Sequence, residues 1–155
     1  MIDLLALCAF NAAYAQVIDS DALERWPAFF TENCRYRITH VENENEGLAA
    51  GIVYADSRAM LEDRIAALRE ANIYERQRYR HLIGIPVLDS ADDSGAGAHT
   101  PFMVARIMAT GETTLFATGI YRDRVVRGEA GNLLLAERVA VCDSTVTDTL
   151  LALPL

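Results

Sequence analysis

The sequence predicts an α+β fold in which N-terminal helices pack on one curved, mainly antiparallel sheet. In the first half of the chain, apolar residues recur at helical spacing in two segments. In the second half, they alternate with polar residues over long runs that short glycine-containing turns separate. Helices and strands that are segregated in this way are typical of the α+β class. A long curved sheet wrapped on a helix forms a cone, and we expect one such domain over residues 1–155.

The first elements are expected to be two helices and a strand. Ile2 to about Ile18 is rich in alanine and leucine, which favours a helix. The cluster Asp19–Asp21 is typical of an N-cap and predicts a second, short helix through Trp26. Cys34–His40 alternates apolar residues with arginine and threonine, which indicates a half-buried strand.

A helix that leads directly into a strand occupies the middle of the chain. After an acidic loop over Val41–Glu46 and a short strand over Gly51–Ala55, Asp56 or Ser57 can cap the helix. The apolar stripe of this helix contains Leu61, Ile65 and Leu68. The strand that follows the helix has one face made of Tyr79, His81, Ile83, Ile85 and Val87. This helix therefore needs a sheet to pack on.

Four strand-like runs complete the chain: Gln77–Leu88, Phe102–Thr110, Thr113–Arg127 and Leu133–Asp143. Pro86 implies a bulge or a sheet edge, and Gly119 predicts a kink in a curved strand. The small and polar residues of Asp89–Thr100 predict a flexible connection. In the last run, Leu133, Leu135, Val139 and Val141 are expected to share one face.

Composition excludes several classes of protein. The net charge of −8 argues against a protein that tracks nucleic-acid phosphates. No apolar run is long enough to span a membrane. Ala13-Tyr14-Ala15 is similar to a signal-peptidase site, but no positive charge precedes it. The three cysteines are far apart, so we interpret them as reduced core residues of a cytoplasmic protein.

The residue types that bind iron are scarce. A Rieske cluster needs two cysteines and two histidines in close pairs, and no cysteine here has a histidine within three residues. A mononuclear iron site needs two histidines and a carboxylate that face one point. The chain has only three histidines, His40, His81 and His99, and they are far apart in the sequence. We therefore expect no metal, cofactor or catalytic iron site in this chain.

Two groups of polar residues are candidates for function. His40, His81, Asp143 and Tyr14 could form an acid–base pocket inside the cone. Alternatively, His81 is a core histidine with a hydrogen-bonded partner and Asp143 caps a turn, and this structural interpretation is favoured.

The second group is a run of arginines in one strand, within a chain whose fourteen basic residues are all arginine. Arg76, Arg78 and Arg80 either form a solvated strand face or pair with carboxylates at a subunit interface. Exposed aromatic side chains and the apolar C-terminal residues are also expected to drive association. Those C-terminal residues are Leu150, Leu151, Leu153 and Leu155.

Three runs carry a resemblance to a known family: Asp21–Ile38, Met60–Ile65 and Arg78–His81. The first resembles the opening of a ketosteroid-isomerase-like (nuclear transport factor 2-like) cone. The other two are similar to the small (β) subunit of aromatic-ring-hydroxylating dioxygenases, and the similarity covers essentially the whole chain.

The resemblance implies a self-trimer within an α₃β₃ hexamer, a reductase that acts through the complex, and an aromatic carboxylate as substrate. It implies that the large (α) subunit holds the Rieske [2Fe–2S] cluster and the mononuclear Fe(II). No catalytic residue of this chain follows from the resemblance. The alternatives are a stand-alone cone enzyme, of the isomerase or dehydratase type, that uses His81, Asp143 or Tyr14, and a small-ligand binding protein. An open cavity with converging polar groups would favour the alternatives.

Overall fold

The computed structural model describes residues 1–45, 53–71, 76–144 and 153–155. Its helices are α1 (Leu4–Asp19), the 3₁₀-helix η1 (Leu23–Phe29), α2 (Val41–Asn45) and α3 (Arg58–Ala71). Its strands are β1 (Phe30–His40), β2 (Val53–Ala55), β3 (Gln77–Ile83), β4 (Val87–Asp92), β5 (Gly95–Met108), β6 (Thr113–Arg127) and β7 (Leu133–Cys142). Among the described residues, no helix is long and apolar enough to cross a bilayer.

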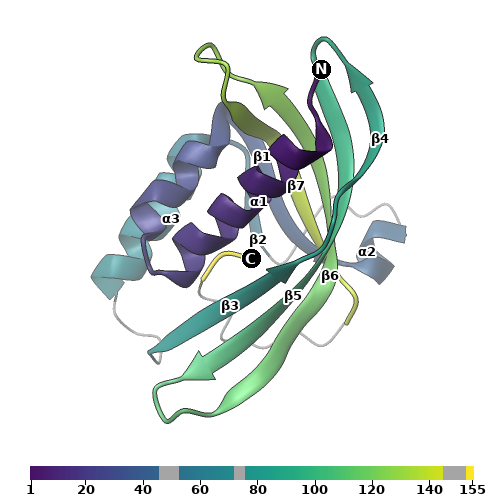
Figure 1. Cartoon of the computed structure of the whole chain (residues 1–155). Coiled ribbons are helices and arrows are strands. Elements are labelled where there is room, and N and C mark those ends of the chain that lie inside the picture. The colour runs from purple at the N-terminus through teal and green to yellow at the C-terminus, as the bar shows by residue number, and fades with distance from the viewer. Residues whose placement is uncertain (46–52, 72–75, 145–152) are drawn as a thin grey trace.

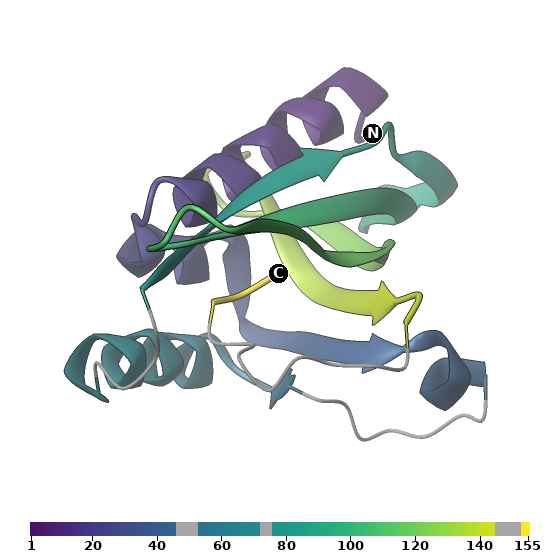
Figure 2. The same cartoon turned by 90° about the horizontal axis from the view of Figure 1, so that it is seen from below.

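The strands form one curved sheet in the order β2-β1-β7-β6-β5-β3, with β4 paired to β5. All strand pairs are antiparallel except β1 with β7, which is parallel, so the predicted mainly antiparallel sheet is confirmed. Helix α1 lies across one face of this sheet and packs on β3, whereas α3 packs on β1 and β2 at the other edge (Figure 1). Seen from below, the sheet curves around its inner side, and the C-terminus lies on this inner side (Figure 2).

The two predicted long helices are confirmed, and each begins at a capping side chain. Asp3 caps α1 by accepting a hydrogen bond from the Ala6 N–H at 2.8 Å. Ser57 does the same for α3 by accepting from the Met60 N–H at 3.2 Å. The predicted stripe of α3 also packs inward, since Leu61 and Ile65 are buried.

The acidic cluster Asp19–Asp21 does not cap a helix as the sequence predicts. No side chain caps the start of η1, and Asp19 is instead the last residue of α1. Asp21 adopts a left-handed backbone conformation (φ 61°), which aspartate tolerates better than most residues. Its carboxylate and that of Glu24 bind Arg69 of α3 at 3.0 and 2.7 Å. The hydrogen bond from Arg69 lowers the pKa of Glu24.

Two segments predicted to be loops contain regular structure. The acidic segment Val41–Glu46 contains the short helix α2. The supposed flexible connection Asp89–Thr100 is part of the β4–β5 hairpin, whose turn is held by Asp92 accepting from the Ser94 and Gly95 N–H groups. The sequence analysis missed this part of β5 because its buried residues are small and do not give the large apolar side chains that usually indicate a strand. They are Ala96, Ala98 and Thr100, all fully buried.

An extra residue in β7 reverses its alternation. Arg124 pairs with Glu137 and Val125 with Leu135, so Ala136 has no opposite residue in β6. Leu135 and Ala140 belong to the core cluster, whereas Val139 and Val141 do not. The prediction that Leu135, Val139 and Val141 share a face is therefore wrong, because strict two-residue alternation does not continue across this irregularity.

The absence of a side chain at Gly119 in β6 allows the backbone of β7 to approach closely. A Cβ at this position would lie 2.2 Å from the Val141 carbonyl oxygen, and β6 shows no register shift there. We expect Gly119→Ala to lower the free energy of unfolding by about 1–3 kcal/mol through overpacking. Urea unfolding followed by circular dichroism measures this. Leu5→Ala, at a 79% exposed position of α1, should change little, and equal losses in both variants would contradict the steric explanation.

Candidate functional site

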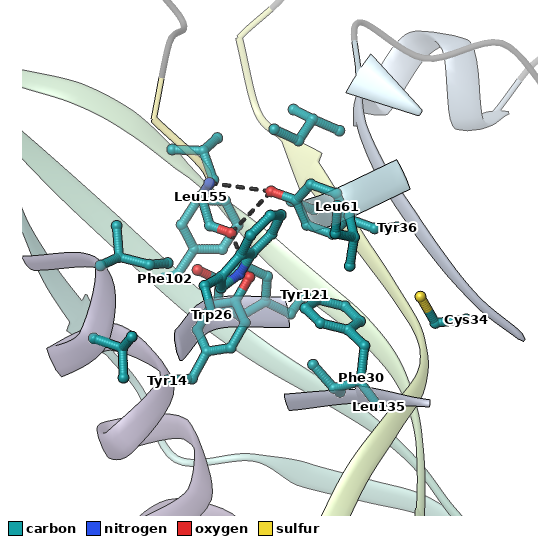
Figure 3. Packing of buried hydrophobic residues seen from close by; sticks show 14 of the residues in the cluster. Tyr14, Trp26, Phe30, Cys34, Tyr36, Leu61, Phe102, Tyr121, Leu135 and Leu155 are labelled. Carbon is teal, nitrogen blue, oxygen red and sulfur yellow. Dashed lines mark hydrogen bonds between the residues drawn. The ribbon is translucent and has the colours of Figure 1, made fainter. Parts of the chain in front are cut away.

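Aromatic side chains fill the interior of the cone (Figure 3). Trp26 of η1 meets Phe30 and Tyr36 of β1 edge to face, with ring centroids 5.5 and 5.1 Å apart. On the opposite wall, Phe102 stacks on Tyr121 at 4.3 Å. All five side chains are at most 2% exposed. This part of the interior is a packed core that excludes water.

The end of the chain completes this core. Leu153 and Leu155 are 4% and 1% exposed. The Leu155 carbonyl oxygen accepts hydrogen bonds from the hydroxyls of Tyr14 at 2.7 Å and Tyr36 at 3.1 Å (Figure 3). The expectation that Leu153 and Leu155 form an exposed association surface is therefore wrong, because the core of the same chain covers them. Leu150 and Leu151 lie outside the described residues.

A buried charged cluster lies beside these tyrosines. Arg138 of β7 donates two hydrogen bonds to Asp123 of β6, at 2.8 and 2.7 Å, and a third to Asn11 of α1 at 2.7 Å. Its guanidinium carbon lies 4.3 Å from the ring centre of Tyr14 and 4.0 Å from that of Tyr121. Burial alone would lower the pKa of Arg138, but the neighbouring Asp123 carboxylate raises it by more than burial lowers it. The net shift of the pKa is therefore upward. Burial also raises the pKa of Tyr14, against the influence of Arg138.

His81 lies on the inner face of β3 beside Tyr79, as predicted, but its partner is Asp19. The His81 Nδ1 lies 2.7 Å from Asp19 Oδ1, and the other oxygen of Asp19 accepts from the His81 backbone N–H at 2.8 Å. The two side chains are 0% and 6% exposed. Asp19 thus joins the end of α1 to the free edge of the sheet.

The four residues of the proposed acid–base pocket are not all brought together. Asp143 is exposed at the end of β7, where it accepts a hydrogen bond from the Thr118 hydroxyl at 2.8 Å. His40 is only half-buried at the end of β1. Only His81 and Tyr14 have buried side chains. The placement of Asp143 in the cone is therefore wrong, because β7 presents it on the outer face with Val139 and Val141.

The groove next to His81 is a surface feature. It has a volume of about 690 Å³ and lies between α1 and the free edge of β3, with Ala12, Gln16 and Ile83 in its lining. Since the His81 side chain is fully buried, the groove does not expose the imidazole to a substrate. This arrangement does not provide the open pocket with converging acid–base groups that a cone enzyme needs.

Within the part of the chain that the structure describes, no three histidine, cysteine or acidic side chains gather as metal ligands. The cysteines Cys8, Cys34 and Cys142 are free thiols, and burial raises the pKa of Cys142 to about 11. His99 pairs at the surface with Asp89, at 3.1 Å. These residues do not fit an iron–sulfur cluster or a mononuclear iron site.

The predicted arginine run is on the surface. Arg76, Arg78 and Arg80 are all exposed, and Arg78 and Arg80 alternate with the buried Tyr79 and His81. Leu82 continues their face, and the strand register places Met103, Leu115 and Ile120 on the same side of the sheet. We call this set the outer-face patch: Arg78, Arg80, Leu82, Met103, Leu115 and Ile120.

The outer-face patch is unusually apolar for a solvent-facing sheet surface. Leu82 is 66% and Leu115 62% exposed, and Met103 and Ile120 are also exposed. Aromatic side chains, in contrast, are mostly buried in the described residues, with Tyr54 as an exposed exception. The expectation of many exposed aromatic residues is therefore wrong, and exposed aliphatic residues form the apolar surface instead.

Comparisons with known proteins agree on one family. Residues 1–139 match the model of the SnoaL-like domain. The chain is 63% identical, over all 155 residues of both chains, to the terephthalate 1,2-dioxygenase terminal oxygenase component subunit β1 of a Comamonas species. It is 39% identical to the anthranilate 1,2-dioxygenase small subunit of Burkholderia cepacia, over 92% of this chain and 88% of that one.

A solved structure gives the same result. The crystal structure of a protein assigned as the β subunit of an aromatic-ring-hydroxylating dioxygenase from Novosphingobium aromaticivorans superposes with a TM-score of 0.89 at 36% identity. The match covers 98% of this chain and 96% of that one. The cone, the family model and the full-length relatives are consistent: this chain belongs to the β subunits of aromatic-ring-hydroxylating dioxygenases, within the SnoaL-like domain family.

Proposed function

We propose that this chain is the structural β subunit of a terephthalate-hydroxylating terminal oxygenase. One observation supports terephthalate as the substrate: the chain is 63% identical to a terephthalate 1,2-dioxygenase β subunit over the full length of both chains. The chain acts as one cone-shaped domain over residues 1–155, and it works in the cytoplasm. Its role is to hold the complex together while the large subunit carries out the cis-dihydroxylation.

The proposed division of labour places the iron centres outside this chain. The large (α) subunit holds the Rieske [2Fe–2S] cluster and the mononuclear Fe(II), and a reductase delivers electrons through the complex. The described residues support this division, since they do not fit either iron site. The packed cone supports a non-catalytic role, because Trp26, Tyr36 and Leu155 occupy space that a substrate would need.

The outer-face patch, together with Arg76, is the proposed assembly surface. Exposed aliphatic side chains beside arginines are typical of an interface that buries its apolar centre and pairs its charges. Guanidiniums form forked hydrogen bonds to carboxylates, and an acidic chain such as this one supplies carboxylates to its own copies. We propose that this surface contributes to a β trimer within an α₃β₃ hexamer.

Turnover by assembled complexes tests the structural role. We expect His81→Ala and Asp143→Asn to leave the rate per intact complex within about twofold of the wild type, because neither residue reaches a substrate. His81→Ala should lower the yield, since it removes the imidazole that pairs with one oxygen of the buried Asp19 carboxylate. The measurement is terephthalate consumption after co-expression with the large subunit and addition of the reductase.

A catalytic cone would behave differently in the same assay. Loss of a general acid or base costs about a hundredfold or more in rate. Such a loss in fully assembled His81→Ala complexes would contradict the structural role. The substrate is tested separately with the wild-type complex. A preference for benzoate or anthranilate over terephthalate would contradict the terephthalate assignment but leave the structural role unaffected.

A further inference from the structure

We propose that a surface pocket between α1, η1 and the β6–β7 turn binds a small aromatic carboxylate. The pocket has a volume of about 810 Å³, and its lining includes Phe10, Phe29, Leu133, Arg25 and Arg127. This volume lies in the range typical of small-molecule sites. We call it the helix–turn pocket. The inference goes beyond the proposed function, which assigns no ligand to this chain.

The apolar part of the helix–turn pocket is held in place by the core. Phe10 of α1 meets Phe29 of η1 edge to face, with ring centroids 5.4 Å apart and an angle of 69° between the ring planes. Both rings and Leu133 of β7 pack against the hydrophobic core while remaining only partly buried. A planar aromatic ring that entered the pocket would gain favourable ring contacts, so this wall favours an aromatic ligand.

Two guanidiniums supply positive charge to the same pocket. Arg127 donates hydrogen bonds to the Gly131 carbonyl at 3.0 Å and to the Met1 carbonyl at 3.2 Å. These bonds hold the side chain but use only two of its five N–H donors, and they do not neutralise its charge. In the described part of the chain, neither Arg127 nor Arg25 pairs with a carboxylate.

The carboxylate in the described lining, that of Glu24, does not cancel this charge. Arg69 of α3 donates to both oxygens of Glu24, at 2.7 and 3.2 Å, and so occupies the carboxylate. The pocket therefore keeps an excess of positive charge in a chain whose net charge is −8. Guanidiniums bind carboxylates through forked, charge-assisted hydrogen bonds. An aromatic ring that bears a carboxylate satisfies both parts of the pocket, and two arginines favour a dicarboxylate.

The test is a chemical-shift titration of the ¹⁵N-labelled full-length chain at low ionic strength, with terephthalate as the probe. We expect the backbone amides of Ala28 and Gly131 to shift saturably, with a dissociation constant of about 1 mM or lower. Terephthalamide has the same ring without charge and should bind at least about tenfold more weakly. Cyclohexane-1,4-dicarboxylate keeps both charges without the aromatic ring and should bind about three- to tenfold more weakly.

Three variants locate the site. Arg25→Gln should weaken terephthalate binding about fivefold or more, and it should fold normally because Arg25 is exposed. Ala9→Trp places a large side chain in the pocket from an exposed position of α1 and should abolish binding. Arg35→Gln is the matched control, since it removes an exposed arginine of β1 outside the pocket and should bind terephthalate like the wild type.

The proposal is overturned if terephthalate causes no saturable shift at these amides, or if either control compound binds as tightly as terephthalate. It is also overturned if Arg35→Gln weakens binding as much as Arg25→Gln, because the protein's arginines would then attract the anion without a site. Circular dichroism shows that each variant is folded. Since no turnover enters the measurement, its outcome is independent of whether the assembled complex hydroxylates terephthalate.

Discussion

Replacing Arg138 by methionine should cost about 3–5 kcal/mol in the free energy of unfolding, a large share of a typical domain's stability. The guanidinium is completely buried and makes three hydrogen bonds, two to Asp123 and one to Asn11. Methionine fills part of the space but leaves the Asp123 carboxylate buried without a counter-charge. Urea unfolding of the full-length chain, followed by circular dichroism, measures the loss.

Two further variants show whether the unpaired charge is the cause. Arg138→Met combined with Asp123→Leu removes both charges and should recover most of the loss, since apolar replacement of a buried pair is often neutral. Arg69→Met breaks a salt-bridge cluster whose arginine is 34% exposed, and it should cost less than about 1 kcal/mol. A double variant no more stable than Arg138→Met would show that the arginine acts through packing and its ring contacts instead.

The elements that the sequence predicted correctly are those with strong local signals. The bounds of β6 are the predicted Thr113–Arg127, because Gly111 and Gly128 delimit a run of alternating residues. Helix α3 begins after Ser57 because that hydroxyl accepts a backbone hydrogen bond, as its position predicted. Signals of this kind depend only on neighbouring residues, so tertiary packing did not need to be known.

The errors come from contacts between distant segments. The sequence analysis assigned no role to Arg138 or Asp123, although their positions directly opposite each other on β7 and β6 were a usable signal once the hairpin was assumed. Asp19 was predicted to belong to a helix cap, because its actual partner, His81, is distant in the sequence. The burial of Leu155 depends on two tyrosines far away in the chain, which no local pattern reports.

The irregularity at Ala136 links these errors to function. A single unpaired residue reverses the two faces of β7, which places Arg138 inside the cone and Asp143 outside it. The interior is thereby occupied by a paired charge and aromatic rings rather than by an acid–base pocket. The surface that remains available for function is the outer side of the sheet, where β3, β5 and β6 expose aliphatic side chains.

Leu82→Asp should therefore disrupt assembly while leaving the subunit folded. Leu82 is 66% exposed, so the substitution removes few contacts within the chain. In an interface it would bury a charge at an apolar centre, which costs about 3 kcal/mol or more, roughly a hundredfold in association. Sedimentation velocity of the complex co-expressed with its large subunit measures this, and circular dichroism confirms the fold.

Two comparisons make the assembly prediction specific to the outer-face patch. Arg80→Ala should weaken the same association by about 1.5–3 kcal/mol where water is excluded, because it loses forked bonds to carboxylates. Leu5→Asp introduces the same charge at a 79% exposed position of α1, outside the patch, and should assemble normally. If Leu5→Asp prevented assembly while Leu82→Asp did not, the interface would lie on the helical side of the cone and the outer-face patch would face solvent.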